Sequence, residues 1–152
     1  MVWARAGRRY RRAMAQSDAV QNAVDQALGR VLLGLHPRVE TDGVTGSATY
    51  RPQPEHRGAP GWVHGGFTAT VLDHFCARIA RAALGMRVAT GTLDLRYRQP
   101  ITLDGGPYEV LGAADPPGSR TVRVRASINR ADGRPLAEAR GLFVGVAPLD
   151  RH

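Results

Sequence analysis

Two features in the middle of the chain have the residue types needed for hydrolytic chemistry. His64, Gly65 and Gly66 open a predicted helix, and Asp73 follows about two turns later in the same helix. The first backbone N–H groups of a helix have no partner inside it and lie at the positive end of the helix dipole. They can therefore polarise a carbonyl or hold an oxyanion. A pair of glycines leaves these groups uncovered, although two glycines also suit a tightly packed turn.

Asp73 is the strongest candidate for a catalytic group. It stands mid-helix among alanines, where burial disfavours a carboxylate unless a partner stabilises the charge. A carboxylate in such surroundings can act as a general base or as a nucleophile. The alternative is a structural Asp that holds a loop or pairs with an arginine such as Arg96.

The spacing sets a condition on how the two features can cooperate. Gly65 and Asp73 are eight residues apart, which is about 12 Å along a helix. A carbonyl held at the helix start is therefore out of reach of Asp73 in the same chain. If both act on one substrate, two copies of the helix must lie antiparallel across an interface. Such an approach is allowed by small residues on one helix face, which are Gly66, Ala69, Cys76 and Ala80.

Periodicity and turn signals predict the elements that position these residues. The helix is expected at 64–84, closed by Gly85, and its apolar and small residues predict that it is buried. An amphipathic helix is expected at 17–35. Residues 38–52 predict a β-hairpin, in which Asp42-Gly43 indicates a type I′ turn. Further strands are expected at 88–97, 108–114, 120–129 and 136–146.

These elements predict an α+β fold, in which one antiparallel sheet of five or six strands wraps a single long helix. In the strand at 120–129, valines alternate with Arg123 and Arg125, so one face should be buried and the other presented to water or to a ligand. The chain of 152 residues has room for one domain, expected at 13–152. It follows a basic head at 1–12 that holds five arginines and no acid.

Composition narrows the chemistry further. The single cysteine, Cys76, excludes an internal disulfide and a cysteine-based zinc cluster, and we expect it to be a core residue. All 21 basic residues are arginine, which excludes lysine Schiff-base chemistry and a P-loop lysine. No stretch approaches ~18 consecutive apolar residues, and no apolar segment of a signal peptide follows the basic head. We therefore expect a cytoplasmic protein with no membrane span, no nucleic-acid partner and a solvated head.

The combined motif resembles a known enzyme family. The pattern Pro60-Gly-x-Val-His-Gly-Gly, then Leu72-Asp73, then Thr90-x-x-Leu93-x-x-x-Tyr97-x-x-Pro100 is similar to that of hotdog-fold acyl-CoA thioesterases of the phenylacetate-degradation type. The resemblance covers roughly residues 36–147. It implies one long helix wrapped by an antiparallel sheet, a homodimer or a tetramer of two dimers, and hydrolysis of an acyl thioester to a free acid and coenzyme A without a metal or other cofactor.

The resemblance also implies a role for each motif residue. Asp73 matches the carboxylate that activates water or attacks the carbonyl. The backbone N–H of Gly65 or Gly66 matches the group that polarises the thioester carbonyl from the partner chain. His64 matches the histidine that orients the loop and the helix start, and Thr90 matches the hydroxyl that helps to hold the water.

Two positions leave alternatives open. Thr92 is expected to point to the same side of its strand as Thr90 and could replace it. Many relatives have Asn or Gln about seven residues before the first motif glycine, where this chain has Gly58. His56 or Gln53 are the candidate substitutes.

The substrate class follows from these residues as a hypothesis. Aromatic side chains are candidates for an apolar acyl pocket, and arginines for the phosphates of coenzyme A. The leading interpretation is an acyl-CoA thioesterase; the alternatives are a thioesterase acting on acyl-carrier-protein thioesters and a non-catalytic acyl-binding dimer. The candidate substrate contacts are Trp62, Phe67, Arg57, Arg120 and His56.

Overall fold

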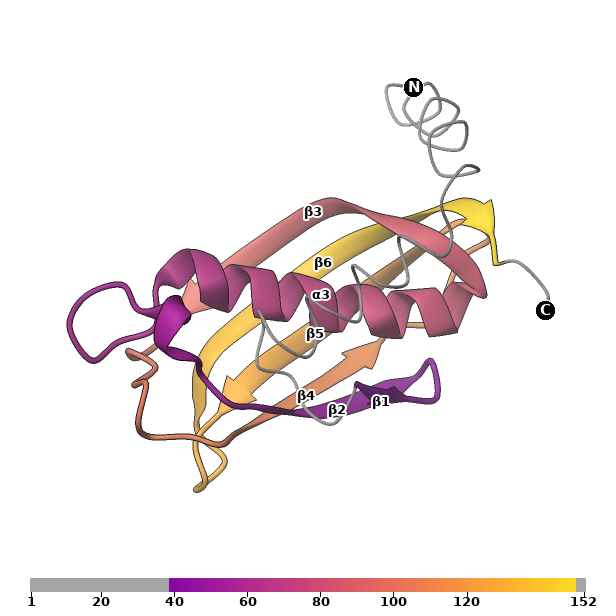
Figure 1. Ribbon diagram of the computed structural model, residues 1–152. Coiled ribbons are helices and arrows are strands. Elements are labelled where there is room, and N and C mark those ends of the chain that lie inside the picture. The colour runs from indigo at the N-terminus through magenta and orange to yellow at the C-terminus, as the bar shows by residue number, and fades with distance from the viewer. Residues whose placement is uncertain (1–38, 150–152) are drawn as a thin grey trace.

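The computed structural model describes residues 39–149, in which one long helix lies against one antiparallel sheet (Figure 1). The predicted helix at 17–35 and the basic head at 1–12 lie outside the described residues. In chain order the elements are β1 Glu40–Thr41, β2 Thr45–Tyr50, the 3-10 helix η2 Pro54–His56, α3 Gly65–Leu84, β3 Met86–Tyr97, β4 Tyr108–Ala114, β5 Thr121–Asn129 and β6 Pro135–Pro148.

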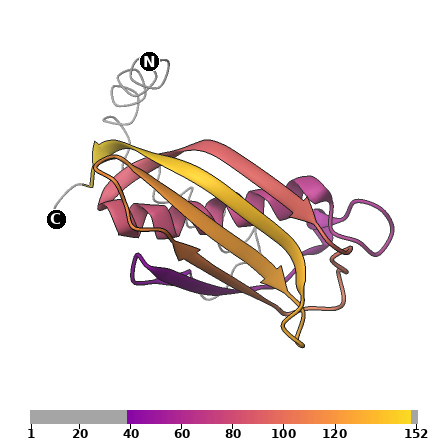
Figure 2. The same cartoon turned by 180° about the vertical axis from the view of Figure 1, so that it is seen from behind.

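The sheet has six strands in the order β1-β2-β4-β5-β6-β3, and every neighbouring pair is antiparallel. Seen from behind, it passes across α3 and curves around it (Figure 2). The predicted α+β architecture, a sheet of five or six strands wrapped around one helix, is therefore confirmed. The order places β3, which follows α3 directly, at one edge of the sheet.

Side chains of α3 and of the facing strands form the core. In α3 the largest fully buried side chains are Phe75, Leu72 and Ile79. In β5, Val122 and Val124 are buried while Arg123 and Arg125 are exposed, which confirms the predicted alternation. Burial of apolar side chains at about 25 cal/mol per Å² is the main force that holds α3 on the sheet.

The ends of α3 agree with the predicted bounds. His64 is the N-cap residue, and Gly85 ends the helix in the left-handed region at φ 60°. Glycine adopts this conformation without the steric cost that a Cβ imposes. The chain reverses at Gly85 and enters β3 at Met86, so β3 runs back along the helix.

The predicted hairpin forms, but its turn is not type I′. That turn requires positive φ at two successive residues, and in residues 39–149 only glycines have positive φ; here Gly43 has it and Asp42 does not. The Asp42 carboxylate instead accepts the N–H groups of Val44, at 2.8 Å, and Thr45, at 2.7 Å. These bonds lower the pKa of Asp42 and stabilise a longer turn.

Within the part of the chain that the structure describes, no helix is long and apolar enough to cross a membrane.

The position of Cys76 predicts that its thiol is unreactive in the folded protein. The residue is fully buried, and this burial, with a smaller contribution from the charge of Asp73, raises its thiol pKa to about 12. Iodoacetamide at neutral pH should therefore leave native Cys76 unmodified and label it fully in concentrated guanidinium chloride. Mass spectrometry of the two samples measures this difference, and rapid labelling of the native protein would contradict the core position.

Candidate active site

The start of α3 is held by the side chain of its own N-cap residue. His64 has extended backbone angles, and its Nδ1 accepts the N–H of Gly66 at 2.9 Å. The ring nitrogen that accepts carries no proton, so a neutral His64 ring has its proton on Nε2. This cap compensates for the low helix propensity of two successive glycines, each about 1 kcal/mol worse than alanine.

The hydrogen bonds around the two glycines distinguish their N–H groups. Gly66 N–H is occupied by His64, and the carbonyl oxygen of His64 accepts the N–H groups of Phe67 and Thr68. The Gly65 carbonyl oxygen accepts the hydroxyl of Tyr97 at 2.8 Å. Within residues 39–149 the Gly65 N–H has no acceptor, so Gly65 offers the N–H group that can bind a further oxygen.

His56 anchors the loop that leads into the helix. It is fully buried, its ring stacks on Phe67 with centroids 4.7 Å apart, and its Nδ1 accepts the Gln53 N–H at 3.2 Å. Because Nδ1 is thereby an acceptor, the Tyr50 hydroxyl at 2.9 Å donates to it as well. The His56 carbonyl oxygen then accepts the N–H of His64 at 2.7 Å. His56 therefore fixes the helix start from inside the core.

This placement corrects one predicted substrate contact. A side chain with no exposed surface cannot touch a substrate in this conformation, so His56 is a core residue and not part of an accessible surface. Gln53, the other candidate substitute for the missing amide, uses its side-chain nitrogen on the Arg51 carbonyl oxygen at 3.0 Å.

Gly58 lies where a larger residue does not fit. A Cβ built on it would stand 2.9 Å from the Cα of His64, closer than real Cβ contacts come. The loop returns on itself here, since Gly58 N–H donates to the Trp62 carbonyl oxygen at 2.9 Å. The path of this loop therefore leaves no room at position 58 for the Asn or Gln that many relatives have there.

Asp73 is paired with Thr90, the residue that the resemblance assigned to holding the water. The Thr90 hydroxyl donates to Asp73 Oδ1 at 2.7 Å, from β3 to the middle of α3. Asp73 is half-buried, which differs from the expected full burial. One carboxylate oxygen is thus held by Thr90, and within residues 39–149 the other accepts no hydrogen bond, so it can take up a proton.

The expectation that Thr92 points to the same side as Thr90 is wrong. The register of β3 against β6 shifts between these two residues, with Thr90 opposite Phe143 and Thr92 opposite Leu142. Such a bulge places two residues opposite one and turns the later side chain to the other face of the sheet. Thr90 accordingly contacts Asp73, whereas Thr92 is exposed.

The other predicted substrate residues are not brought together. Trp62 is 47% exposed, and its backbone forms an isolated antiparallel bridge with that of Thr102 beside the helix start. Arg57 is exposed at the same end, where its backbone forms an isolated antiparallel bridge with that of Val63. Arg120 lies at the opposite end of the sheet and donates to the Gly145 carbonyl oxygen at 3.2 Å. Arg57 and Arg120 of one chain therefore cannot hold the same phosphate group.

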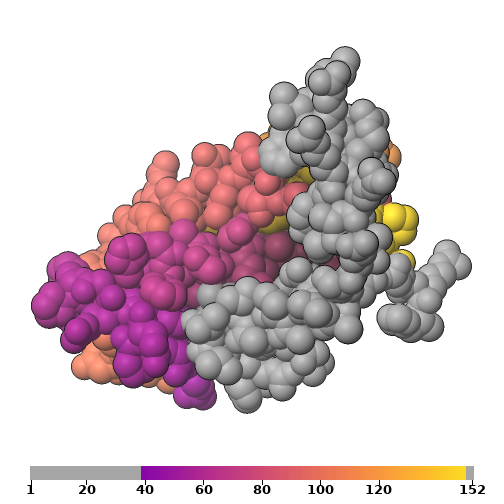
Figure 3. All heavy atoms as spheres, turned by 45° about the horizontal axis from the view of Figure 1, so that its top comes forward, coloured from indigo at the N-terminus to yellow at the C-terminus, as the bar shows by residue number. Residues whose placement is uncertain are grey.

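In the space-filling view, the loop before α3 and the start of the helix form one end of the described surface, beside atoms of β3 (Figure 3). Phe67, another predicted contact, is half-buried there between the His56 and His64 rings. Among residues 39–149 no group of three or more His, Cys, Asp or Glu is arranged to hold a metal ion.

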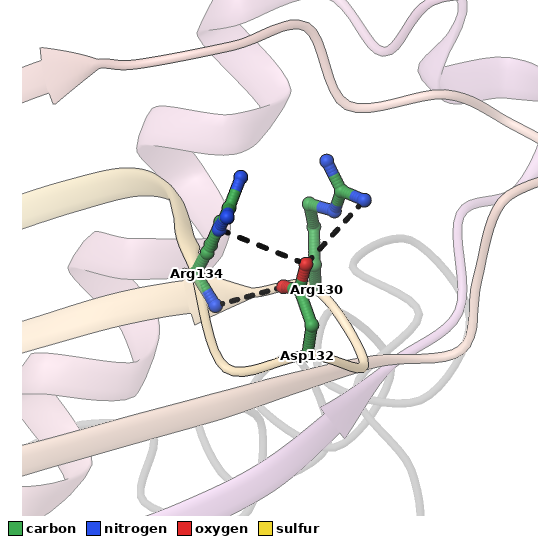
Figure 4. Close-up of polar contacts among 3 residues, drawn as sticks. All are labelled: Arg130, Asp132 and Arg134. Carbon is green, nitrogen blue, oxygen red and sulfur yellow. Dashed lines mark hydrogen bonds and ion pairs between the residues drawn. The ribbon is translucent and has the colours of Figure 1, made fainter.

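Within residues 39–149, several other arginines lie over the outer face of the sheet and in the β5–β6 turn. A groove of about 700 Å³ on that face is lined by charges of both signs, Arg96, Arg125, Arg140, Asp94 and Glu138 among them. In the β5–β6 turn, Asp132 contacts both Arg130 and Arg134 (Figure 4). This groove lies on the face of the sheet away from α3, so it is separate from Asp73.

Comparison with solved structures identifies the fold. AziG from S. sahachiroi superimposes with a TM-score of 0.70 at 19% identity, over 78% of this chain and 94% of that one. A thioesterase superfamily protein superimposes with a TM-score of 0.61 at 31% identity, over 70% of this chain and 52% of that one. This chain therefore spans about half the length of that protein. A hypothetical thioesterase with coenzyme A from Streptococcus pneumoniae TIGR4 superimposes with a TM-score of 0.64 at 15% identity, over 76% of this chain and 87% of that one.

Two of these three neighbours are named as thioesterases, and the chain has the hotdog fold, with one long helix against a six-stranded antiparallel sheet. The resemblance read from the sequence is confirmed at this level. No protein-family model matches the chain.

The contact at Gly58 predicts a cost for adding a single methyl group. Gly58→Ala should lower the free energy of unfolding by ~1–3 kcal/mol, because the new Cβ displaces the backbone of His64. Gly118→Ala is the matched control: its Cβ meets ordinary contacts at 3.5 Å, and it shares the same loss of conformational entropy in the unfolded state. Chemical denaturation measures both, and equal stabilities of the two variants would show that the loop yields at no cost.

Proposed function

We propose that this chain is a thioester hydrolase that cleaves acyl-CoA to a free acid and coenzyme A. The observation that carries the proposal is the 2.7 Å hydrogen bond from Thr90 to Asp73, which holds a half-buried carboxylate in a defined orientation on a thioesterase-type fold. Structural neighbours named as thioesterases, one of them with coenzyme A, support the reaction class.

The proposed reaction uses water activated by Asp73. The carboxylate takes a proton from water as the water oxygen bonds to the thioester carbon. The carbonyl electron pair moves to oxygen, whose developing charge accepts the Gly65 N–H. The tetrahedral intermediate then collapses, the carbon–sulfur bond breaks, and the leaving thiolate takes the proton back from Asp73. Direct attack of the carboxylate on the carbonyl, through an anhydride, is the alternative route.

Thr90 has a definite part in this scheme. Its hydroxyl proton is donated to Asp73 Oδ1, so its oxygen retains lone pairs that can accept a hydrogen bond from the attacking water. Oδ2 of Asp73 is then the oxygen that receives the proton. Thr90 thus orients both the base and the nucleophile.

In the proposed mechanism one site needs two chains. Gly65 and Asp73 stand about 12 Å apart along α3, too far to act on a single carbonyl. We propose an antiparallel pair of helices in which Gly65 of one chain faces Asp73 of the other. The edge strand β3 has no strand partner on its outer side within residues 39–149, so it offers backbone groups for such an assembly.

Coenzyme A is the preferred thiol carrier in this proposal because two structural neighbours are named with coenzyme A or acetyl-CoA bound. A carrier protein with an acidic surface would need a net positive docking face. Here Arg140 stands opposite Asp94 and Arg96 opposite Glu138 across β3 and β6. These two pairs neutralise part of the charge on this face, where Arg123 and Arg125 are also exposed. A non-catalytic acyl-binding dimer is distinguished by the first variant below.

Asp73→Asn should nearly abolish hydrolysis while the fold remains. The amide is close in shape to the carboxylate but cannot take a proton from water, so kcat should fall by about 10²–10⁴-fold with little change in KM. Thiol release from a panel of acyl-CoA substrates measures this, and the melting temperature is recorded on the same preparation. Normal turnover by folded Asp73→Asn would refute the mechanism.

Thr90→Ala and Thr92→Ala form a matched pair for the same assay. Thr90→Ala should lower kcat by about tenfold, because one positioning hydrogen bond to the base is lost. Thr92→Ala, on the other face of the strand, should leave kcat unchanged. Equal effects of the two changes would contradict the assignment of Thr90.

Gly65→Pro removes the proposed carbonyl-binding N–H. Proline is favoured at the first helical position, and the extended backbone of His64, at φ −62° and ψ 135°, suits the residue before a proline. The Gly65→Pro protein should therefore fold but turn over at least about a hundredfold more slowly, as when one oxyanion donor is removed.

Mixing Gly65→Pro chains with Asp73→Asn chains tests whether the site is shared. Each protein alone is inactive, but a mixed dimer has one site with both groups intact. After subunit exchange, activity should recover to about a quarter of the wild-type value, since half the dimers are mixed and each has one intact site. No recovery in a mixture shown by sedimentation or native mass spectrometry to contain mixed dimers would place both groups in one chain.

A further inference from the structure

The start of α3 is also tied to the sheet edge by Tyr97. The Tyr97 hydroxyl donates to the Gly65 carbonyl oxygen at 2.8 Å, although the two residues are 32 positions apart in the sequence. The ring lies over the helix start, with its atoms 3.6 Å from where a Cβ on Gly65 would stand. Tyr97 is nevertheless 53% exposed, so burial of an apolar ring does not account for its position.

The contact adds a restraint from outside the helix to a peptide group in the first turn of α3. The peptide between Gly65 and Gly66 is flanked by two residues without Cβ atoms, which have the widest choice of backbone angles. In this structure its oxygen accepts Tyr97 and its N–H donates to His64 Nδ1. Both ends of the peptide are therefore held by side chains, one from β3 and one from the N-cap residue.

A fixed peptide on one side of Gly65 restrains the N–H on the other side. The N–H of Gly65 belongs to the preceding peptide and shares the Gly65 Cα with the peptide that Tyr97 holds. The preceding peptide is itself held through the His64 carbonyl oxygen, which accepts Phe67 and Thr68. With both planes held, the Gly65 N–H keeps one direction, which is the condition for a preorganised carbonyl donor.

We propose that Tyr97 is a positioning residue, whose hydroxyl holds the Gly65–Gly66 peptide so that the Gly65 N–H is aimed at the substrate carbonyl. This inference rests on the proposed function, since it assigns the Gly65 N–H to a thioester carbonyl. Tyr97 acts through the backbone and does not touch the reacting atoms. Its hydroxyl should matter for the rate more than for substrate affinity.

Tyr97→Phe is the variant to test, because it removes the hydroxyl and keeps the ring. Tyr108→Phe is the matched control: the Tyr108 hydroxyl also donates to a backbone carbonyl oxygen at 2.8 Å, that of Thr102, and lies 2.9 Å from the Thr102 hydroxyl, but it makes no hydrogen bond to the Gly65–Gly66 peptide. Any general effect of losing a hydroxyl-to-carbonyl bond appears in both variants. Only an effect on the helix start is specific to Tyr97→Phe.

Amide hydrogen exchange tests, without a substrate, whether the Tyr97 hydroxyl holds the Gly65–Gly66 peptide. In Tyr97→Phe the Gly66 amide should exchange about fivefold faster, as expected for the loss of one hydrogen bond, while Tyr108→Phe leaves it unchanged. Equal exchange of Gly66 in Tyr97→Phe and in the wild type would overturn the inference. This measurement stands even if the chain proves to have no thioesterase activity.

Kinetics and infrared spectroscopy test whether this contact aims the Gly65 N–H at the substrate carbonyl. Tyr97→Phe should lower kcat by about fivefold with KM within twofold, and Tyr108→Phe should keep the wild-type kcat. The probe for spectroscopy is the best acyl-CoA substrate, labelled with carbon-13 at the carbonyl and bound to Asp73→Asn to prevent turnover. The stretching frequency of its labelled carbonyl should be lower than in solution. In the Asp73→Asn, Tyr97→Phe double variant, this frequency should return part of the way to the solution value.

The outcomes separate the inference from the function on which it rests. No acyl-CoA turnover by the wild type, or no displacement of the carbonyl band in Asp73→Asn, would refute the proposed function. A displaced band that stays the same in the double variant, with kcat unchanged in Tyr97→Phe, would refute the role of Tyr97 and leave the proposed function intact.

Discussion

The reversal of the chain at Gly85 is the constraint on which the candidate site depends. A single residue in the left-handed conformation joins α3 to β3, so the strand must run back along the helix that it follows. Two hydrogen bonds then connect the antiparallel pair, one from Thr90 to Asp73 and one from Tyr97 to Gly65. Both groups proposed for catalysis are thus positioned by one strand. A residue with a Cβ at position 85 would strain this reversal and both contacts together.

The start of α3 combines weak helix propensity with strong external support. Two glycines leave the N–H of Gly65 uncovered, but they also make the first turn the least rigid part of the helix. The support comes from the His64 cap, from the Tyr97 hydroxyl and from His56, which holds the His64 backbone from the core. The arrangement therefore resembles a preorganised donor more than an ordinary helix start.

Much of this fold is predictable from sequence because its signals are local. The bounds of α3 follow from apolar periodicity together with His64 and Gly85, and the alternation of Val124 and Arg125 predicts a strand with one buried face. What is not predictable depends on distant contacts. The bulge that separates Thr90 from Thr92 arises from pairing with β6. The burial of His56 arises from packing on Tyr50 and Phe67, and the turn at Asp42 forms through its own carboxylate. The resemblance pointed to Asp73 and Thr90, but only the structure shows that they touch.

The half-buried state of Asp73 has a consequence for how activity would depend on assembly. In the single chain its carboxylate keeps contact with water, so folding does not have to stabilise a buried charge. If a second copy covers this face, the same carboxylate loses water only when the opposing Gly65 N–H and a substrate arrive. The free energy needed to desolvate the base is then supplied by association and substrate binding, and not by the fold of one chain. If the site is shared as proposed, a monomer should be stable but inactive for the same physical reason, and the fraction of active sites should rise with protein concentration until dimers are fully formed.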